Sequence, residues 1–320
     1  MPELPEVEIT ARLLDGALRG ARIESALAPG INALKTYDPP LPVLEGATIA
    51  GVRRRGKNLI VDVVGVGAED EAGVGAEDEV GARPEAEAGA GTGSAGGELA
   101  LLIHLMSAGR LQLYETRAGP RDRTSRLLVR LRLADRSERE LRLREFGSKQ
   151  AAWVKLLRAD ELERDEALAK LGPEAWPDPP PVPELAKLLD APRPLHPLLR
   201  DQRTIAGIGR SWVDEILWQA RLSPYKRGAD LSADEVARLR EATIAVLGGA
   251  IAHYETAIAL PIPDKLPMPL QVHRHEGEPC PRCATTLQAV HYEDYTIAYC
   301  PACQTDGRVL KDRRLSRLLK

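Results

Sequence analysis

The chain has 320 residues and a formal net charge of −3, a length that allows two domains with separate cores. It lacks a run of 18 apolar residues and its start is charged, so we expect a cytoplasmic protein without a membrane span or secretion signal. Residues 66–98 hold nine acidic residues against one arginine, a net charge of −8, so the rest of the chain carries +5. The acidic total therefore does not exclude nucleic acid as a partner.

The first residues after Met1 combine a latent secondary amine with two carboxylates, in the order Pro2-Glu3-Leu4-Pro5-Glu6. Removal of Met1, expected before a small residue, makes Pro2 the N-terminal residue. An α-amino group has a pKa near ~8, so part of it is unprotonated at neutral pH. Such an amine can attack an electrophilic carbon and form an iminium ion. The alternative is that the prolines only begin a helix, where proline is tolerated.

The N-terminal half reads as one helix followed by strands. Val7, Leu14 and Leu18 have helical spacing, which predicts a helix over residues 6–19. The strand-like segments that follow are too short and too closely spaced for parallel crossovers, so they predict an antiparallel sandwich. We expect strands at 48–55, 58–64, 99–104, 111–115, 126–133 and 140–143.

Residues 66–98 interrupt two of these strands. The motif Gly-Val-Gly-Ala-Glu-Asp-Glu occurs twice there, and the stretch has almost nothing to bury, so we expect a disordered insertion at a hairpin tip. It is either a tolerated loop expansion or a segment that mimics DNA or binds a partner.

The C-terminal half begins beyond five prolines in residues 177–183, which indicate a loop or linker. Helical spacing returns over residues 231–258. Between them, Gly207-Ile208-Gly209 predicts a tight turn. The backbone amides of this turn and of the next helix start can cradle a phosphate, although most Gly-x-Gly sequences are simply turns.

Four cysteines form two Cys-x-x-Cys pairs separated by sixteen residues: Cys280, Cys283, Cys300 and Cys303. This spacing is typical of a tetrahedral zinc site on a hairpin. Because the cysteines fill all four ligand positions, we expect one structural Zn²⁺ per chain. The basic tail that follows is either a phosphate contact or a solvated helix end.

Together these motifs resemble the formamidopyrimidine-DNA glycosylase and endonuclease VIII family of base-excision repair enzymes, from Pro2 to Gln304 apart from the acidic insertion. The resemblance implies an α+β fold with an N-terminal antiparallel β-sandwich, a helical domain with a helix-two-turn-helix element, and a zinc-finger β-hairpin. The expected boundaries are 1–160, 161–270 and 271–304, followed by the basic tail at 305–320.

The resemblance assigns roles to four residues. Pro2 would form a Schiff base at C1′ of the sugar, Glu3 would protonate the sugar ring oxygen, and Glu6 would support the amine. Lys57 would bind the phosphate beside the lesion and assist β-elimination. The implied protein is a monomeric DNA glycosylase and abasic-site lyase, associated with a bacterial nucleoid, that excises oxidised bases from duplex DNA.

Two alternatives remain. A protein of the same fold could bind damaged DNA with only weak catalysis, and the intact catalytic residues argue against this. A zinc-ribbon protein unrelated to repair would leave the sequence at the N-terminus unexplained.

A glycosylase that acts on duplex DNA must extrude the damaged nucleotide and fill the gap with side chains. Arg144 and Phe146 match the family's Arg-x-Phe wedge, and Phe146 is the only phenylalanine of the chain. The alternative for Phe146 is a buried core aromatic. In the sequence His104-Leu105-Met106, the methionine comes one position earlier than the family's wedge methionine. Either the loop shifts to present Met106 or the wedge is incomplete.

Other departures concern phosphate contacts and specificity. Arg210 replaces the family's phosphate-binding asparagine, and Tyr295 replaces a finger arginine linked to δ-elimination. We therefore expect mainly the β-elimination product, unless Arg210 or Arg282 supplies the missing guanidinium. The segment 256–271 is short and proline-rich where enzymes for oxidised purines carry a lesion-capping loop, which leaves the preferred lesion open.

Overall fold

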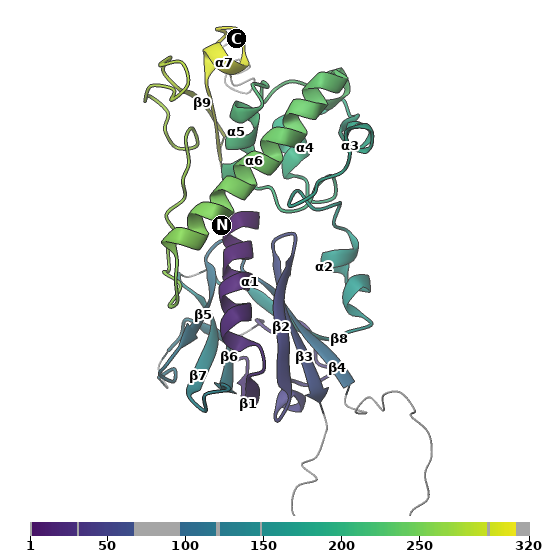
Figure 1. Ribbon diagram of the computed structural model, residues 1–320, viewed down its shortest axis with the longest axis vertical. Helices are drawn as coiled ribbons and strands as arrows, with labels where there is room; N and C mark the ends of the chain where they lie inside the picture. The colour runs from purple at the N-terminus through teal and green to yellow at the C-terminus, as the bar shows by residue number, and fades with distance from the viewer. Residues whose placement is uncertain are drawn as a thin grey trace, which may run out of the picture.

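The computed structural model describes residues 2–30, 32–66, 97–119, 122–147, 149–292 and 295–311. A strand-rich body and a helical body follow one another along the chain, and the N-terminus lies where they meet (Figure 1). The predicted acidic insertion falls almost wholly outside the described residues, as does the basic tail beyond residue 311. Within the described residues, each helix is too short or too polar to span a bilayer.

Helix α1 (Leu4–Leu18) begins two residues earlier than the sequence predicted and ends one residue earlier. Its start is set by a capping box, in which the Glu3 amide donates to Glu6 Oε2 at 2.9 Å. Its buried face packs against the strands, and in Figure 1 the helix runs along the sheet from the junction of the two bodies.

Eight strands form one antiparallel sheet in the order β5-β7-β6-β1-β2-β3-β4-β8. Strands β1 and β2 share a single register pair, Arg22 and Thr48, which is flanked by backbone hydrogen bonds such as that from the Ile23 amide to the Ala47 carbonyl oxygen (2.8 Å). Each strand has a register shift near this point. The sheet is thus two four-stranded halves that share one hydrophobic core, as the predicted sandwich requires. The strands are β1 (Arg22–Leu27), β2 (Thr48–Arg55), β3 (Asn58–Val66), β4 (Gly97–His104), β5 (Gly109–Tyr114), β6 (Ser125–Arg132), β7 (Glu138–Glu145) and β8 (Trp153–Arg158).

The sequence prediction missed β1 and β8, which lack a clear period of two. In β1 only Ile23 is fully buried. In β8, Val154 and Leu156 face the main core, while Leu157 packs on the opposite face with Ile60. A strand covered on both faces does not alternate between apolar and polar residues.

The helical body contains the long helix that the sequence predicted. Helix α6 (Ala233–Ala257) begins with a capping box between Ser232 and Glu235 and covers the predicted 231–258 almost completely. The other elements are α2 (Glu166–Ala169), α3 (Val182–Leu189), α4 (Leu195–Arg200), α5 (Arg210–Gln219), the hairpin strands β9 (Gln288–His291) and β10 (Thr296–Tyr299), α7 (Pro301–Gln304), and short 3₁₀ turns at Leu41–Leu44, Leu162–Arg164 and Gly228–Asp230.

Where the two bodies meet, each contributes side chains to the hydrophobic core of the other. Leu4, at the start of α1, belongs to the core of the helical body. In return, Tyr254 and Ile258 at the end of α6 belong to the core of the sheet. Because the N-terminus lies at this crossing, the residues that begin the chain are held by both bodies.

Candidate active site and metal centre

The Glu3 side chain is buried against the start of α5. Its carboxylate accepts hydrogen bonds from the amides of Ser211 (2.9 Å) and Trp212 (3.3 Å). The N-terminus of a helix carries a partial positive charge that stabilises an anion there. Gly209 allows the approach, because a Cβ on this residue would lie 2.2 Å from Glu3 Cδ. The helical body therefore fixes the orientation of Glu3.

The first glycine of the predicted turn, Gly207, also contacts the N-terminal segment. Gly207 has a φ of +107°, and a Cβ there would lie 2.4 Å from Leu4 Cδ1. Its carbonyl oxygen accepts a hydrogen bond from the Leu4 amide at 3.1 Å. The sequence allowed a phosphate on the amides of this turn and of the helix start, or a simple turn. The Ser211 and Trp212 amides bind Glu3 instead, and a DNA contact at Gly207, Gly209 or Arg210 stays a prediction.

Glu6 lies one helical turn further along α1, between the two bodies. Burial, together with the neighbouring Glu3, raises the pKa of Glu6 to about 7. Its carboxyl accepts hydrogen bonds from the Tyr254 hydroxyl (2.7 Å) and the Trp212 indole nitrogen (3.1 Å), which partly oppose this rise. A group with such a pKa can take up and release a proton near neutral pH.

Lys57 lies in the turn between β2 and β3 and is only 7% exposed. Its Nζ makes no hydrogen bond or ion pair with another described residue. Burial lowers the pKa of this amine, the charge of Glu3 partly offsets the effect, and the charge of Arg200 adds to it. The structure thus holds a poorly solvated ammonium group without a bonded counter-ion.

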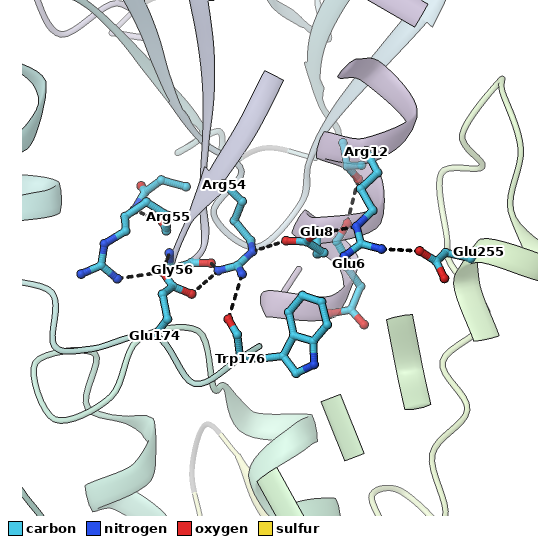
Figure 2. A network of polar contacts seen from close by, with 11 residues as sticks. Glu6, Glu8, Arg12, Arg54, Arg55, Gly56, Glu174, Trp176 and Glu255 are labelled. Atoms are coloured by element: carbon cyan, nitrogen blue, oxygen red, sulfur yellow. Dashed lines mark hydrogen bonds and ion pairs between the residues drawn. The ribbon is translucent and has the colours of Figure 1, made fainter. Parts of the chain in front are cut away.

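The turn that carries Lys57 is anchored by Glu174, as Figure 2 shows. Glu174 accepts hydrogen bonds from the Gly56 amide (2.6 Å) and Arg55 Nη1 (2.7 Å), and it also pairs with Arg54. Arg54 in turn donates to Glu8 of α1 at 2.7 Å. The network therefore ties the turn both to α1 and to the segment that leads into the helical body.

Two neighbouring cavities border these residues, with volumes of about 700 and 630 Å³, both within the range of ligand sites. Glu3 and Lys57 line the first, and Pro2 and Glu6 line the second. Ser211 contributes to both walls. The structure thus brings together the four residues that the resemblance marks as catalytic.

His104, quoted above only as part of a motif, lines the cavity of Glu3 and Lys57. Its Nδ1 accepts a hydrogen bond from the Met106 amide at 3.0 Å, which places the ring proton on Nε2. Burial, and then the charge of Lys57, lower the pKa of His104 to about 4. His104 is thus neutral at pH 7 and can act as an Nε2–H donor. A histidine at a strand end was the only sequence signal for it.

Phe146 is 41% exposed, so the alternative of a buried core aromatic is wrong. The Arg144 guanidinium lies 4.6 Å from the centre of its ring and donates to the Tyr114 hydroxyl at 2.7 Å. Met106 lies in the turn between β4 and β5 with a φ of 49° and is half-buried. Insertion of these side chains into DNA stays a prediction.

Tyr295, just before β10, is surrounded by flat groups. Its ring stacks on Tyr292 (4.6 Å between centroids) and on His196 (5.8 Å). The guanidinium carbons of Arg200 and Arg210 lie 4.5 and 5.5 Å from its centre. The sequence allowed two arginines to replace the missing finger guanidinium, and one of them, Arg210, does contact the Tyr295 ring. Arg200, which the sequence did not indicate, contacts the same ring.

The other substitute, Arg282, is held elsewhere. It donates to the Trp218 carbonyl oxygen at 2.9 Å and lies over the Trp218 ring. It does not line either cavity.

The four predicted metal ligands converge at the hairpin, with their Sγ atoms all within 4.8 Å of one another. Four thiols at this spacing can hold a tetrahedral metal ion. The Trp218 indole nitrogen donates to Cys280 Sγ at 3.4 Å, which ties the cluster to α5. The predicted four-cysteine metal site is thus present as a geometric cluster.

Two adjacent carboxylates of α5 position the segments that lead into the finger, and sequence analysis missed both. Asp214 accepts hydrogen bonds from the Ala298 amide (3.0 Å) and interacts with His273 Nδ1 (2.7 Å). Glu215, whose pKa is raised by burial, accepts from three consecutive amides, those of residues 271–273. An acidic pair between two apolar pairs, Trp212-Val213 and Ile216-Leu217, was the available signal.

Comparisons with known proteins agree with this architecture. Residues 1–148 match the model of the formamidopyrimidine-DNA glycosylase N-terminal domain, and residues 171–261 match that of its H2TH domain. A formamidopyrimidine-DNA glycosylase of Streptococcus thermophilus is 31% identical, with 95% of this chain and 99% of the relative covered. An uncharacterised glycosylase-like protein of Mycobacterium tuberculosis is 41% identical, with 38% of this chain and 78% of that protein covered.

Solved structures give the same result. The crystal structure of the Lactococcus lactis glycosylase with DNA containing N7-benzyl-Fapy-dG has a TM-score of 0.74 and 26% identity. The match covers 95% of this chain and all of that one. A complex of the same Lactococcus enzyme with DNA containing an oxidised pyrimidine has a TM-score of 0.73 and 25% identity, with the same coverage.

Proposed function

The chain belongs to the formamidopyrimidine-DNA glycosylase family of DNA repair enzymes, and from this premise we propose that it is a bifunctional DNA glycosylase and abasic-site lyase. Its substrate would be an oxidised base in duplex DNA, and its nucleophile would be the amine of Pro2 after removal of Met1. The observation that carries the proposal is the meeting of Pro2, Glu3, Glu6 and Lys57 around two cavities where the bodies join.

The first step is displacement of the base. The Pro2 amine attacks C1′ of the sugar as the bond from C1′ to the base breaks, and the base leaves with the bonding electrons and takes a proton from water. Glu3, in its protonated form, gives its proton to the ring oxygen so that the sugar opens. Loss of the amine proton and ring opening leave an iminium between Pro2 and C1′. Glu6 can accept that proton, because its pKa of about 7 lets it switch between both forms at neutral pH.

The second step is strand cleavage by β-elimination. The iminium draws electrons from the sugar, a base removes the C2′ proton, and the 3′ phosphate leaves. Lys57 would bind the phosphate beside the lesion, where burial makes its charge more effective than in water. His104 faces the same cavity as a neutral donor and can add a hydrogen bond to a phosphate oxygen.

The metal is proposed to be Zn²⁺, bound by Cys280, Cys283, Cys300 and Cys303. Four thiolates leave no open position, so the ion would hold the hairpin in shape and take no part in the chemistry. Damaged double-stranded DNA is the proposed partner, in keeping with the lesion-containing DNA named for the Lactococcus structures.

Borohydride trapping tests the nucleophile. We expect the reductant to link the mature protein covalently to a duplex with an abasic site. Pro2→Gly should trap slowly, and Glu3→Gln should lose base release. A form with an extra residue before Pro2 is the matched control, because it keeps every side chain but blocks the amine.

Equal trapping by the mature and the extended proteins would refute Pro2 as nucleophile. Tight binding of lesion-containing DNA without trapping or base release would instead support the damaged-DNA-binding alternative. The same assay with duplexes carrying 8-oxoguanine, formamidopyrimidine, thymine glycol or dihydrouracil identifies the preferred lesion.

A further inference from the structure

Arg200, the last residue of α4, lines the cavity shared by Glu3 and Lys57. Its guanidinium lies over the Tyr295 ring and makes no ion pair with another described residue. Three other arginines of the helical body behave differently: Arg193, Arg227 and Arg240 each pair with an aspartate. Among the described residues, Arg200 is therefore a cation that the fold holds in place without a carboxylate partner.

The Tyr295 ring contacts two guanidinium groups. Arg200 and Arg210 both lie within cation–π distance of its ring. The ring is itself fixed in a parallel stack between Tyr292 and His196, and the Tyr292 hydroxyl is 2.7 Å from that of Tyr225. The stack thus connects the metal hairpin to α4. It fixes the Tyr295 ring and thereby the positions of the two guanidinium groups that contact this ring.

The charges around this cavity are unbalanced. Arg200 and Arg210 are close enough to Lys57 to lower the pKa of its amine, which means that like charges repel one another here. Two carboxylates, Glu3 and Glu276, also line this cavity, and Glu3 already accepts two amide hydrogen bonds from α5. A bound anion would relieve the repulsion, and planar guanidinium groups suit a phosphate because they donate in pairs.

We propose that Arg200 and Arg210, supported by Tyr295, form a second phosphate-binding site beside that of Lys57. Its ligand is a backbone phosphodiester of the damaged strand next to the lesion. Arg200 is a DNA-binding residue, and Tyr295 is a positioning residue that acts through the two arginines. This inference rests on the proposed function, because it takes DNA as the ligand.

Binding to a duplex with a tetrahydrofuran abasic analogue, which cannot be cleaved, tests the site without chemistry. We expect Arg200→Gln to weaken binding by about tenfold and to reduce the slope of log Kd against log salt by about 0.9, the value of one phosphate contact. Arg164→Gln is the matched control, because Arg164 is an exposed arginine outside both cavities and should leave affinity and slope unchanged.

The DNA supplies the second half of the test. Single methylphosphonates, which remove one backbone charge, are placed in turn at the phosphates that flank the lesion. At the phosphate bound by Arg200, the substitution should weaken the wild type by about tenfold and Arg200→Gln hardly at all. If every position weakens both proteins equally, or if Arg200→Gln keeps the wild-type slope, the site does not exist.

Tyr295 variants separate support of the arginines from direct binding. Tyr295→Phe keeps the ring and should keep the wild-type DNA affinity and salt slope. Tyr295→Leu removes the ring, and it should reduce the affinity and the slope as much as Arg200→Gln does. A loss in Tyr295→Phe equal to that in Tyr295→Leu would overturn the positioning role. Thermal unfolding of each variant identifies any that fail to fold, and Arg200→Lys, which keeps the charge, should retain most of the slope.

Product ends give a chemical readout. Sequence analysis expected mainly the β-product because Tyr295 lacks a guanidinium, but two guanidinium groups lie on its ring. We now expect 3′-phosphate ends from the wild type and several-fold fewer from the Arg200→Gln, Arg210→Gln double variant. Only β-product from the wild type would contradict this. Failure of the proposed function would show instead as absent borohydride trapping, which does not need these arginines.

Discussion

Gly209 lies so close to Glu3 that any side chain at this position would collide with the Glu3 carboxylate, since a Cβ would stand 2.2 Å from Cδ. The contact joins residues that begin the chain to the helix that organises its C-terminal half. The close approach to Glu3 is by itself enough to require a glycine at this position.

Gly209→Ala should therefore displace Glu3 or the start of α5. We expect unfolding to become easier by about 1–3 kcal/mol, the usual cost of overpacking. The rate of base excision should fall by about a hundredfold, because a misplaced catalytic group loses its geometry. Single-turnover excision at saturating enzyme and thermal unfolding measure the two effects.

Gly249→Ala is the control for this substitution. Gly249 lies within α6, and a Cβ there meets nothing within 4 Å. The change should leave excision unaltered and stabilise the helix by up to about 1 kcal/mol. Equal excision by the two variants would show that the Glu3 contact is irrelevant to catalysis.

Glu6 should make the stability of the protein depend on pH. Its pKa is about 7 in the folded protein and 4.5 as the unperturbed value, so the folded state binds the proton more tightly. The associated stability is present below pH 4.5 and is lost as pH rises through 7, by up to about 3 kcal/mol. Chemical denaturation at pH 5 and pH 8 should show this loss, and Glu6→Gln should largely remove it.

Tyr254→Phe extends the pH test. The Tyr254 hydroxyl donates to Glu6 and lowers its pKa, so its removal should raise that pKa further. The loss of stability toward alkaline pH should then be larger than in the wild type. A variant with the wild-type dependence would mean that this hydrogen bond does not favour the charged form of Glu6.

The Glu174 network should matter for Lys57 as well as for stability. Glu174→Ala leaves Arg54, whose side chain is 6% exposed, with one carboxylate partner fewer. We expect a cost of about 3 kcal/mol and a slower β-elimination step, because the Lys57 turn loses its anchor. The measurement is strand cleavage of a preformed abasic site, compared with unfolding in denaturant.

Glu255→Ala removes a carboxylate from the exposed end of the same network. Its cost should stay below about 1 kcal/mol, and cleavage should be unchanged. If Glu174→Ala also leaves cleavage unchanged despite its lower stability, the network does not position Lys57.

Deletion of the acidic insertion should raise non-specific DNA affinity. Residues 67–96 carry eight acidic residues against one arginine, a net charge of −7. Val66 and Gly97 are register partners in the β3–β4 pair, so an Asn-Gly turn can replace the insertion. We expect tighter binding to undamaged duplex at low salt and a smaller gain at high salt, where charges are screened.

An insertion of equal length with every acidic residue changed to its amide is the control for this deletion. It should reproduce most of the gain if charge is the cause. Unchanged or weaker binding by the deletion variant would show that the segment stays away from the DNA or contributes to it.

Motifs and secondary-structure elements that depend on a short stretch of sequence were predictable. The Cys-x-x-Cys pairs and the segment around Pro2 each carry their chemistry within a few residues. Helices α1 and α6 and six of the eight strands of the large sheet follow from local periodicity and capping. Strand β8 was not predictable because elements pack against both of its faces, and β1 was not because only Ile23 in it is fully buried.

Only the tertiary structure decided how these parts meet. The amide of Ser211 reaches Glu3 across 208 residues of sequence, and Glu174 holds the Gly56 turn across 118. Nothing near Arg200 in the sequence indicates that its guanidinium lies over the Tyr295 ring. Tyr295 lies in the hairpin that leads to the second cysteine pair. Sequence periodicity records what each segment does with its neighbours along the chain, whereas the fields and contacts that set pKa values and bind phosphate act through space.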